Sequence, residues 1–265
     1  MKSILFRHLL FVCLILVFFL NSISIAQPNS RIIDGEIAAT GLYPYMASIV
    51  SKEKKNGYKH HCGASIINDR YLLTAAHCVG TGDYVLVGSQ DITKRGGSTS
   101  LEISGFIIHP DFMYLMMEAD IALLKVYGEL GQPLVYLPEM SEEDPAIGKT
   151  HARVVGWGRT NERRKKKISK RLKHGQVNLI SYAECESRFD QVKEVNDIGA
   201  AELPEHLICL QKDPLAQNIF ESASPCNGDS GSPLLVNQEE QLVQVGVASF
   251  ILGDCGSRLL GSGYT

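Results

Sequence analysis

The sequence lacks several features that would indicate other kinds of protein. Its 26 Lys and Arg residues and 29 Asp and Glu residues give a formal net charge of −3, which offers no basis for a nucleic-acid partner. No two cysteines have the CxxC spacing of common zinc sites. No long stretch has convincing helical periodicity, and there is no internal repeat. The hydrophobic fraction of 45% is nevertheless ordinary for a globular protein with a sizeable core.

The first 26 residues differ from the rest of the chain. Lys2 and Arg7 precede an apolar run over residues 9–20, and Ser24 and Ala26 place small side chains where a signal peptidase reads them. Twelve apolar residues are fewer than the ~20 that a membrane-spanning helix needs. We therefore expect residues 1–26 to be a signal peptide rather than a membrane anchor. The mature protein is then secreted, extracellular and free of the membrane.

Secretion changes the interpretation of the cysteines. Cys13 leaves with the signal peptide, and an even number of cysteines in an oxidising compartment predicts three disulfides. Spacing alone cannot choose among the 15 pairings that six cysteines permit. The six are Cys62, Cys78, Cys185, Cys209, Cys226 and Cys255.

Many short apolar runs between turn signals predict an all-β barrel or sandwich. A possible short helix covers residues 182–189. Three prolines interrupt the strands between residues 131 and 145, which form either a linker between two β units or one long surface loop. The expected strands lie at 64–67, 84–87, 103–108, 121–126, 153–155, 176–180, 233–236 and 242–250.

One run of charge stands out. Nine Lys or Arg residues and one Glu lie between Arg159 and Lys173. We interpret this basic segment as a solvated loop, with a heparin-like or acidic partner as the alternative. A loop of this composition is also an easy target for a protease that cuts at basic residues.

Three local patterns together indicate nucleophilic catalysis. His77 follows an apolar strand, Asp120 precedes another, and Ser230 lies in a turn bracketed by glycines. Each has an ordinary structural explanation when taken alone. Together they supply a hydroxyl nucleophile, a base to remove its proton and an acid to orient that base. The glycines free backbone N–H groups to face a developing oxyanion.

From Arg31 to its end, the chain resembles the chymotrypsin-like (trypsin-like) serine proteases. The resemblance implies an all-β fold of two Greek-key six-stranded β-barrels with the active site between them. It also implies barrels over residues 32–134 and 135–265. The motifs that carry it are Arg31-Ile32-Ile33-Asp34-Gly35, Thr74-Ala75-Ala76-His77-Cys78, Asp120-Ile121-Ala122-Leu123, Gly156-Trp157-Gly158, Gly228-Asp229-Ser230-Gly231 and Ser249-Phe250, in the family's order.

Carried across by position, the resemblance assigns roles to individual residues. His77 is the general base and then the general acid, Asp120 stabilises its imidazolium, and Ser230 is the nucleophile. The N–H groups of Gly228 and Ser230 form the oxyanion hole. The implied disulfides are Cys62–Cys78, Cys185–Cys209 and Cys226–Cys255.

The resemblance also implies activation by proteolysis. Cleavage after Arg31 would release a propeptide of residues 27–31 and create a new α-amino group on Ile32. In the family this cation folds inward and pairs with the acid that precedes the nucleophile, here Asp229. Leaving either charge buried alone would cost about 3–5 kcal/mol, so the oxyanion hole depends on cleavage.

The specificity pocket should involve Ser224, Ser249, Phe250 and Ile251. Ser224 stands where enzymes that cut after Lys or Arg usually carry Asp, and Ile251 stands where Gly is usual. The opposite wall falls near residues 261 and 262. We therefore expect a chymotrypsin-like or elastase-like preference for an apolar residue.

Other departures from the family pattern concern single positions and the chain end. Phe250 replaces a usual Trp and keeps an apolar platform. Ser232 replaces a usual Gly, which would cause modest strain if the position needs a positive φ. The paired glutamates of the family's calcium loop are not apparent, so no metal or other cofactor is expected. The chain stops at Thr265, whereas the family continues through a last strand and a C-terminal helix. Without them we expect the second barrel to lack a closing strand and to expose an edge, so either the sequence is incomplete or the protein is compromised in stability.

The sequence therefore predicts a secreted serine endopeptidase made as an inactive precursor. Its expected partners are protein or peptide substrates, an activating protease and protein inhibitors, and the protein should be a monomer. One alternative is a non-catalytic homologue that acts as a binding or regulatory protein. Another is a lectin-like or other all-β secreted module, which leaves the catalytic pattern unexplained.

Overall fold

The computed structural model describes the greater part of the chain that follows the propeptide. The signal peptide, Arg31 and Ile32, Gly261 and much of the basic segment lie outside the described residues. These are 33, 35–53, 57–93, 98–139, 151–160, 168–196, 202–204, 206–213, 215–218, 220–221, 223–251, 255 and 262–264.

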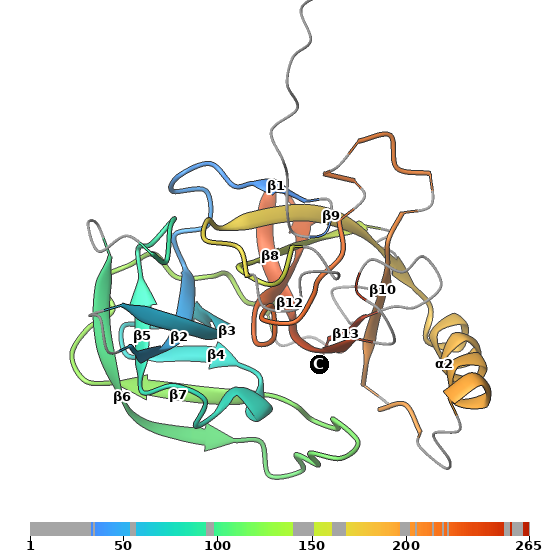
Figure 1. Cartoon of the computed structure of the whole chain (residues 1–265), viewed down its shortest axis with the longest axis horizontal. Helices are drawn as coiled ribbons and strands as arrows, with labels where there is room; N and C mark the ends of the chain where they lie inside the picture. Colours follow the sequence, from blue (N-terminus) through green and yellow to red (C-terminus); the bar gives the residue numbers. More distant parts are fainter. Residues whose placement is uncertain are drawn as a thin grey trace, which may run out of the picture.

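Six antiparallel strands close into a barrel in the order β2-β3-β4-β7-β6-β5. Figure 1 shows this barrel on the left, coloured from blue to green. Its interior is filled by buried aliphatic side chains from successive strands, including Ile49, Ile66, Leu72 and Leu124. The strands are β2 (Met46–Lys52), β3 (Tyr58–Ile66), β4 (Tyr71–Thr74), β5 (Tyr84–Val87), β6 (Thr99–Ile108) and β7 (Ala122–Val126).

The second sheet has the order β1-β9-β10-β13-β12-β11-β8, and β8 pairs with β9 as well. Six strands therefore return on themselves, and β1 (Glu36–Ile37) adds to the outside of β9 although it belongs to the N-terminal half of the chain. The other strands are β8 (His151–Gly156), β9 (Lys173–Ile180), β10 (Ile208–Gln211), β11 (Pro233–Gln238), β12 (Gln241–Ile251) and β13 (Ser262–Tyr264).

The expectation that the second barrel lacks its closing strand is wrong for this structure. Strand β13 consists of only three residues, yet it pairs with β10 on one side and β12 on the other. Pairing Gly263 with both Cys209 and Phe250 joins those strands into a continuous ladder. Residues 262–264 thus occupy the edge between β10 and β12 that was expected to be exposed.

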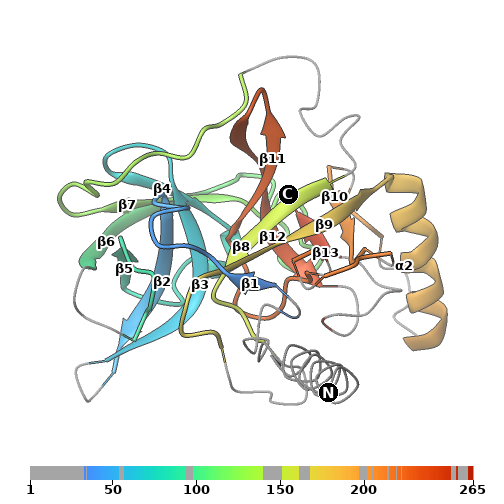
Figure 2. The same ribbon diagram turned by 90° about the horizontal axis from the view of Figure 1, so that it is seen from above.

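One long helix lies beside the second sheet, far from the first barrel (Figures 1 and 2). Helix α2 (Tyr182–Asn196) continues well beyond the end expected at Phe189. Its buried face carries Cys185 and Phe189, which pack against Leu203 and Leu207. Among the described residues, no helix has the length and apolar character needed to cross a membrane.

The two barrels meet along a shared seam. Trp157, Leu235 and Val247 of the second unit pack in the same buried cluster as the interior of the first. The segment between the barrels is fixed to both. Val135 N donates to Ile66 O at 2.8 Å, and Gln244 N donates to Tyr136 O at 2.8 Å. The described part of this proline-interrupted stretch is therefore anchored across the seam rather than being a free linker.

Candidate active site

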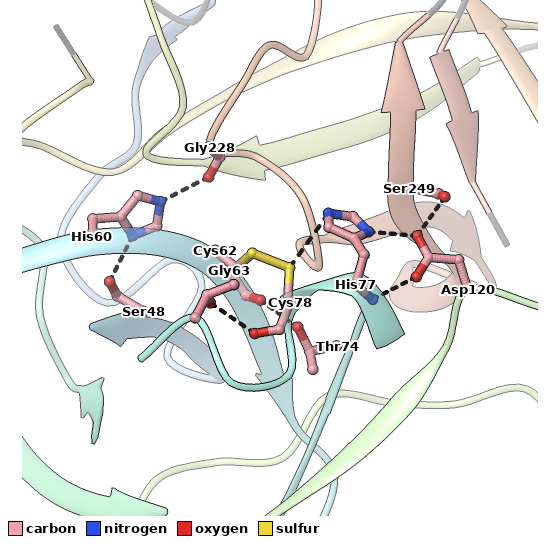
Figure 3. Close-up of a disulfide and its surroundings, with 11 residues drawn as sticks. Ser48, His60, Cys62, Gly63, Thr74, His77, Cys78, Asp120, Gly228 and Ser249 are labelled. Atoms are coloured by element: carbon pink, nitrogen blue, oxygen red, sulfur yellow. Dashed lines mark hydrogen bonds and ion pairs between the residues drawn. A yellow bond between two sulfur atoms is a disulfide. The ribbon is translucent and has the colours of Figure 1, made fainter. Parts of the chain in front are cut away.

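His77 lies at the centre of a one-turn 3-10 helix, Ala76–Cys78, that begins just after β4 ends at Thr74. The Cys62–Cys78 disulfide ties this turn to β3, with a Cα–Cα distance of 6.1 Å. Figure 3 shows the imidazole between the disulfide and Asp120. The His77 side chain keeps 17% of its surface exposed, so this ring is both anchored and accessible from solvent.

Asp120 is fully buried and binds His77 twice. Its Oδ1 accepts the His77 backbone N–H at 2.9 Å, and its Oδ2 accepts the Nδ1–H at 2.6 Å. Ser249 Oγ also donates to Oδ2, at 2.6 Å. Burial by itself would raise the pKa of Asp120, but the contacts from His77 and Ser249 outweigh it and hold the pKa below its usual value. The carboxylate therefore stays charged and fixes the tautomer whose Nε2 carries no proton.

Ser230 lies in a tight turn whose shape depends on two glycines. Gly228 and Gly231 have φ values of +96° and +77°, which side chains with a Cβ rarely adopt. A Cβ on Gly231 would also approach Thr74 Oγ1 to 2.2 Å. Gly63 N donates to Ser230 O at 2.8 Å, which ties the turn to β3 of the first barrel. This bond brings the Ser230 turn to the seam between the barrels. Among the described residues, Ser230 Oγ makes no hydrogen bond to His77, whose Nε2 lies 3.7 Å from Cys78 Sγ.

The N–H groups of Gly228 and Ser230 donate no hydrogen bond to another residue in the described ranges. Neighbouring amides of the same turn do have acceptors: Asp229 N bonds Cys226 O at 2.9 Å, and Ser232 N bonds Asp229 O at 3.0 Å. Two adjacent N–H groups without an internal acceptor are what an oxyanion site requires.

Asp229 is buried directly behind Ser230. Its carboxylate accepts Gly158 N at 2.7 Å and Cys226 N at 2.9 Å. A Cβ on Gly158 would meet this carboxylate at 2.2 Å, which explains the glycine after Trp157. Burial raises the pKa of Asp229 to about 6, although both backbone donors oppose the rise. This is a carboxyl group that a nearby cation would stabilise strongly in its charged form.

His60 is a part of the site that motif matching missed. It is buried on β3, where Ser48 Oγ donates to its Nδ1 at 2.7 Å, and its Nε2–H donates to Gly228 O at 2.7 Å (Figure 3). This bond fixes the carbonyl of Gly228, whose own N–H has no acceptor among the described residues. The available signal was weak: a histidine at an inward-facing position of an apolar strand, two residues before Cys62.

His60 is expected to remain neutral in the folded protein down to about pH 4. Burial lowers its pKa to about 4, whereas an unfolded chain binds the proton near pH 6.5. Above about pH 6.5 the His60 ring is neutral in both the folded and the unfolded protein, so it does not lower the free energy of unfolding. As the pH falls from 6.5 towards 4, only the unfolded chain binds the proton, and the free energy of unfolding falls by up to about 1.4 kcal/mol per pH unit. NMR titration of the His60 ring, repeated in concentrated urea, measures both values. Half-protonation of the folded protein near pH 6 would contradict the assignment.

The chain is similar in sequence to proteins of a known family. Residues 32–265 match the family model described as Trypsin. The chain belongs to the trypsin family. It is 32% identical over 235 residues to trypsin-1 of Astacus astacus, covering 84% of this chain and 90% of that protein. It is 29% identical to ovochymase of Halocynthia roretzi and 28% identical to serine proteinase stubble of Drosophila melanogaster, in each case over 90% of this chain. The chain spans only 14% and 30% of the lengths of those last two relatives.

The three disulfides of this trypsin-family chain are Cys62–Cys78, Cys185–Cys209 and Cys226–Cys255. They are the pairs that the resemblance implied. Two of them flank the site, one at the His77 turn and one at the Ser230 turn. Cys62, His77 and Cys78 also form a group of potential metal ligands, but both sulfurs are bonded to each other and offer no thiolate.

The residues assigned to the specificity pocket lie in different surroundings. Ser224 is buried, and its Oγ donates to Pro225 O at 3.3 Å. Ser249 directs its hydroxyl at Asp120 and so contributes to the histidine–aspartate pair. Phe250 is half-buried and packs against the cluster of Cys185 and Phe189. Ile251 is half-buried at the end of β12.

Ser232 is not strained in the way its replacement of glycine suggested. Ser232 does not have a positive φ. The described non-glycine residues that do are Met117, Ala119, Glu239 and Glu240. Its side chain instead fills space beside Gly63, where an added Cβ would lie 2.1 Å from Ser232 Oγ. The Oγ is buried and has no hydrogen-bond partner within the described part of the chain.

Replacing Ser232 by alanine is expected to stabilise the protein by about 1 kcal/mol, because it removes a buried hydroxyl without a partner. Urea unfolding measures the change. Ser65→Ala is the matched control, since that buried hydroxyl donates to Gln244 Oε1 at 2.5 Å and its loss should destabilise by about 1 kcal/mol. Equal destabilisation by both substitutions would show that Ser232 Oγ is satisfied.

Proposed function

We propose that the protein is a secreted serine endopeptidase that hydrolyses peptide bonds through an acyl-enzyme. The observation that carries the proposal is the pairing of His77 with the fully buried Asp120 at 2.6 Å. This pairing leaves Nε2 of an accessible imidazole as the basic nitrogen. The signal-like residues 1–26 support secretion.

In the proposed mechanism, Ser230 Oγ attacks the carbonyl carbon of the scissile bond and transfers its proton to His77 Nε2. The imidazolium that forms is stabilised by Asp120, and the oxyanion is stabilised by the N–H groups of Gly228 and Ser230. The proton then passes to the leaving amine, and the acyl group remains on Oγ. Water then attacks the acyl carbon while His77 Nε2 takes its proton. The bond between the acyl carbon and Ser230 Oγ breaks, His77 returns the proton to Oγ, and the carboxylic acid leaves.

Activation would follow cleavage after Arg31. The buried Asp229 supports this step, because burial raises its pKa to about 6 and a cation placed beside it would favour the charged carboxylate. The nearby chain start also supports it: Ser224 N donates to Ile33 O at 3.1 Å, which holds residue 33 beside the segment leading to Ser230. The proposed partner of Asp229 is the α-amino cation that cleavage would create on Ile32, the residue before Ile33.

The substrate preference would be for an apolar residue on the acyl side of the cleaved bond. Ser224 has a hydroxyl that already donates to Pro225 O. It has no carboxylate that could pair with a basic side chain of the substrate. A cleavage profile on a peptide library, recorded after activation, tests this preference. Dominant cleavage after Lys or Arg would contradict it.

Labelling with a fluorophosphonate tests catalysis itself. Protein cleaved after Arg31 should become labelled on Ser230, and the uncleaved precursor should react much more slowly. Ser230→Ala is the control for the site of modification. If correctly processed and folded protein is not labelled, the proposal is wrong and a non-catalytic binding role becomes the better explanation.

A further inference from the structure

A buried lysine outside the proposed catalytic group lies against the first residues of the mature chain. Lys173 begins β9 and is only 2% exposed, which is rare for a lysine. Its Nζ donates to Gly35 O at 2.6 Å. A buried ammonium is costly unless it is bonded, and the bond to Gly35 O is one of the contacts that offset this cost.

The segment that Lys173 holds has little structure of its own. Strand β1 is two residues long, and two residues of ladder cannot fix a chain end without other contacts. The start of β9 provides these contacts. Ile37 pairs with Lys173, Glu36 pairs with His174, and Ala38 N donates to Leu172 O at 3.1 Å.

His174 adds an outer contact to the same segment. Its Nε2 lies 3.3 Å from Glu36 Oε1, and its Nδ1 is 2.7 Å from Tyr43 OH. The imidazole also contacts the Phe220 ring edge-on at 5.0 Å between centroids. Glu36 is 49% exposed, so this ion pair is a weaker contact than the buried bond of Lys173.

The charge of Lys173 also acts on Asp229. Burial raises the pKa of Asp229, and the donors of Cys226 and Gly158 and the positive charge of Lys173 oppose that rise. Lys173 therefore acts on both partners of the proposed activation pair. It hydrogen-bonds Gly35 near the start of the mature chain, and its positive charge interacts with the carboxylate of Asp229.

We propose that Lys173 is a positioning residue that clasps the processed N-terminal segment through Gly35 O and keeps Ile32 at Asp229. The proposal rests on the proposed activation after Arg31. Lys173 does not touch substrate; it acts by retaining the chain start, without which the turn that carries Ser230 loses its support.

The test measures how often the new terminus escapes. Protein cleaved after Arg31 is treated with potassium cyanate at pH 7, and carbamylation of the Ile32 α-amino group is followed by mass spectrometry. Cyanate reacts with unprotonated amines. A free α-amino group, with a pKa of about 8, therefore reacts well ahead of lysine side chains, whose pKa is about 10.4. Wild-type protein should react far more slowly than the same protein in urea.

Lys173→Met should raise the carbamylation rate by about tenfold, because it removes a charge-assisted hydrogen bond. Lys170→Met, an exposed lysine three residues earlier, should leave the rate unchanged. Glu36→Gln should raise it by only about two- to fivefold, since the exposed ion pair contributes less. Lys173→Met keeps an unbranched side chain of similar length, but it leaves Gly35 O without this donor, so circular dichroism first checks that the variant folds. The Glu36 variant, at a half-exposed position, keeps the test valid if it does not.

Wild-type rates in both Lys173→Met and Glu36→Gln would overturn the clasp, as would a thermal midpoint that falls with no change in carbamylation. The mass readout does not depend on catalysis. A protected terminus in protein that a fluorophosphonate does not label would therefore contradict the proposed function and leave the clasp supported.

Discussion

Ser230→Ala is expected to lower kcat/KM for peptide hydrolysis by about 10⁶ in a protein that still folds. Ser230 is held by backbone atoms: its carbonyl accepts Gly63 N, and the adjacent Gly231 N donates to Ala248 O at 2.7 Å. Loss of Oγ therefore removes the proposed nucleophile without removing a bond that shapes the turn. The remaining rate would come from the oxyanion hole and substrate binding.

Initial rates on a substrate chosen from the cleavage profile measure this loss. Ser232→Ala, two residues along the same turn, is the matched control and should keep nearly full activity. An Ser230→Ala rate within about 100-fold of wild type would mean that the hydroxyl is not the nucleophile, because removal of a triad nucleophile costs far more.

Asp120→Asn is expected to lower kcat by about 10⁴ with little change in KM. The Asp120 Oδ2 accepts the Nδ1–H of His77 at 2.6 Å, and an amide NH₂ in that place would be a donor facing a donor. The imidazole would then take the opposite tautomer, in which Nε2 carries the proton. In that form His77 cannot accept the hydrogen of Ser230.

Ser249→Ala separates this effect from a general loss of bonding to Asp120. It removes one donor to the same oxygen but leaves the tautomer of His77 intact, so its expected cost in kcat is only about tenfold. The pH dependence of kcat distinguishes the two variants further, since only Asp120→Asn removes the acceptor that stabilises the imidazolium. Equal losses for both variants would contradict the tautomer argument.

Motifs with short-range signatures were recovered from sequence, and contacts made across the fold were not. The glycines around Ser230 and the apolar strands next to His77 and Asp120 can be recognised in the sequence, because the local backbone conformation requires these residue types. His60 and Lys173 cannot: each is an ordinary polar residue in a strand, and only pairing between distant strands shows that one bonds Gly228 and the other Gly35. The role of Ser249 was likewise hidden, since its partner Asp120 lies 129 residues away.

Two expectations failed because the physical context differed from what the letters suggested. Ser232 was expected to be strained, but its backbone has no positive φ and the difficulty lies in an unpaired hydroxyl. The second barrel was expected to have an open edge, but β13 (Ser262–Tyr264) lies there between β10 and β12. A strand this short has no recognisable pattern in the sequence, and its partners define it.

The attachment of β1 to β9 has a consequence for how this molecule could be divided. A gene fragment that encodes residues 135–265 would contain every strand of the second ring. It would leave the start of β9 without its β1 partner and Lys173 without the carbonyl of Gly35. The two halves are therefore not interchangeable modules. Co-expressed as separate polypeptides, the second half would be expected to regain its full set of pairings only when a piece bearing Gly35 to Ile37 is supplied.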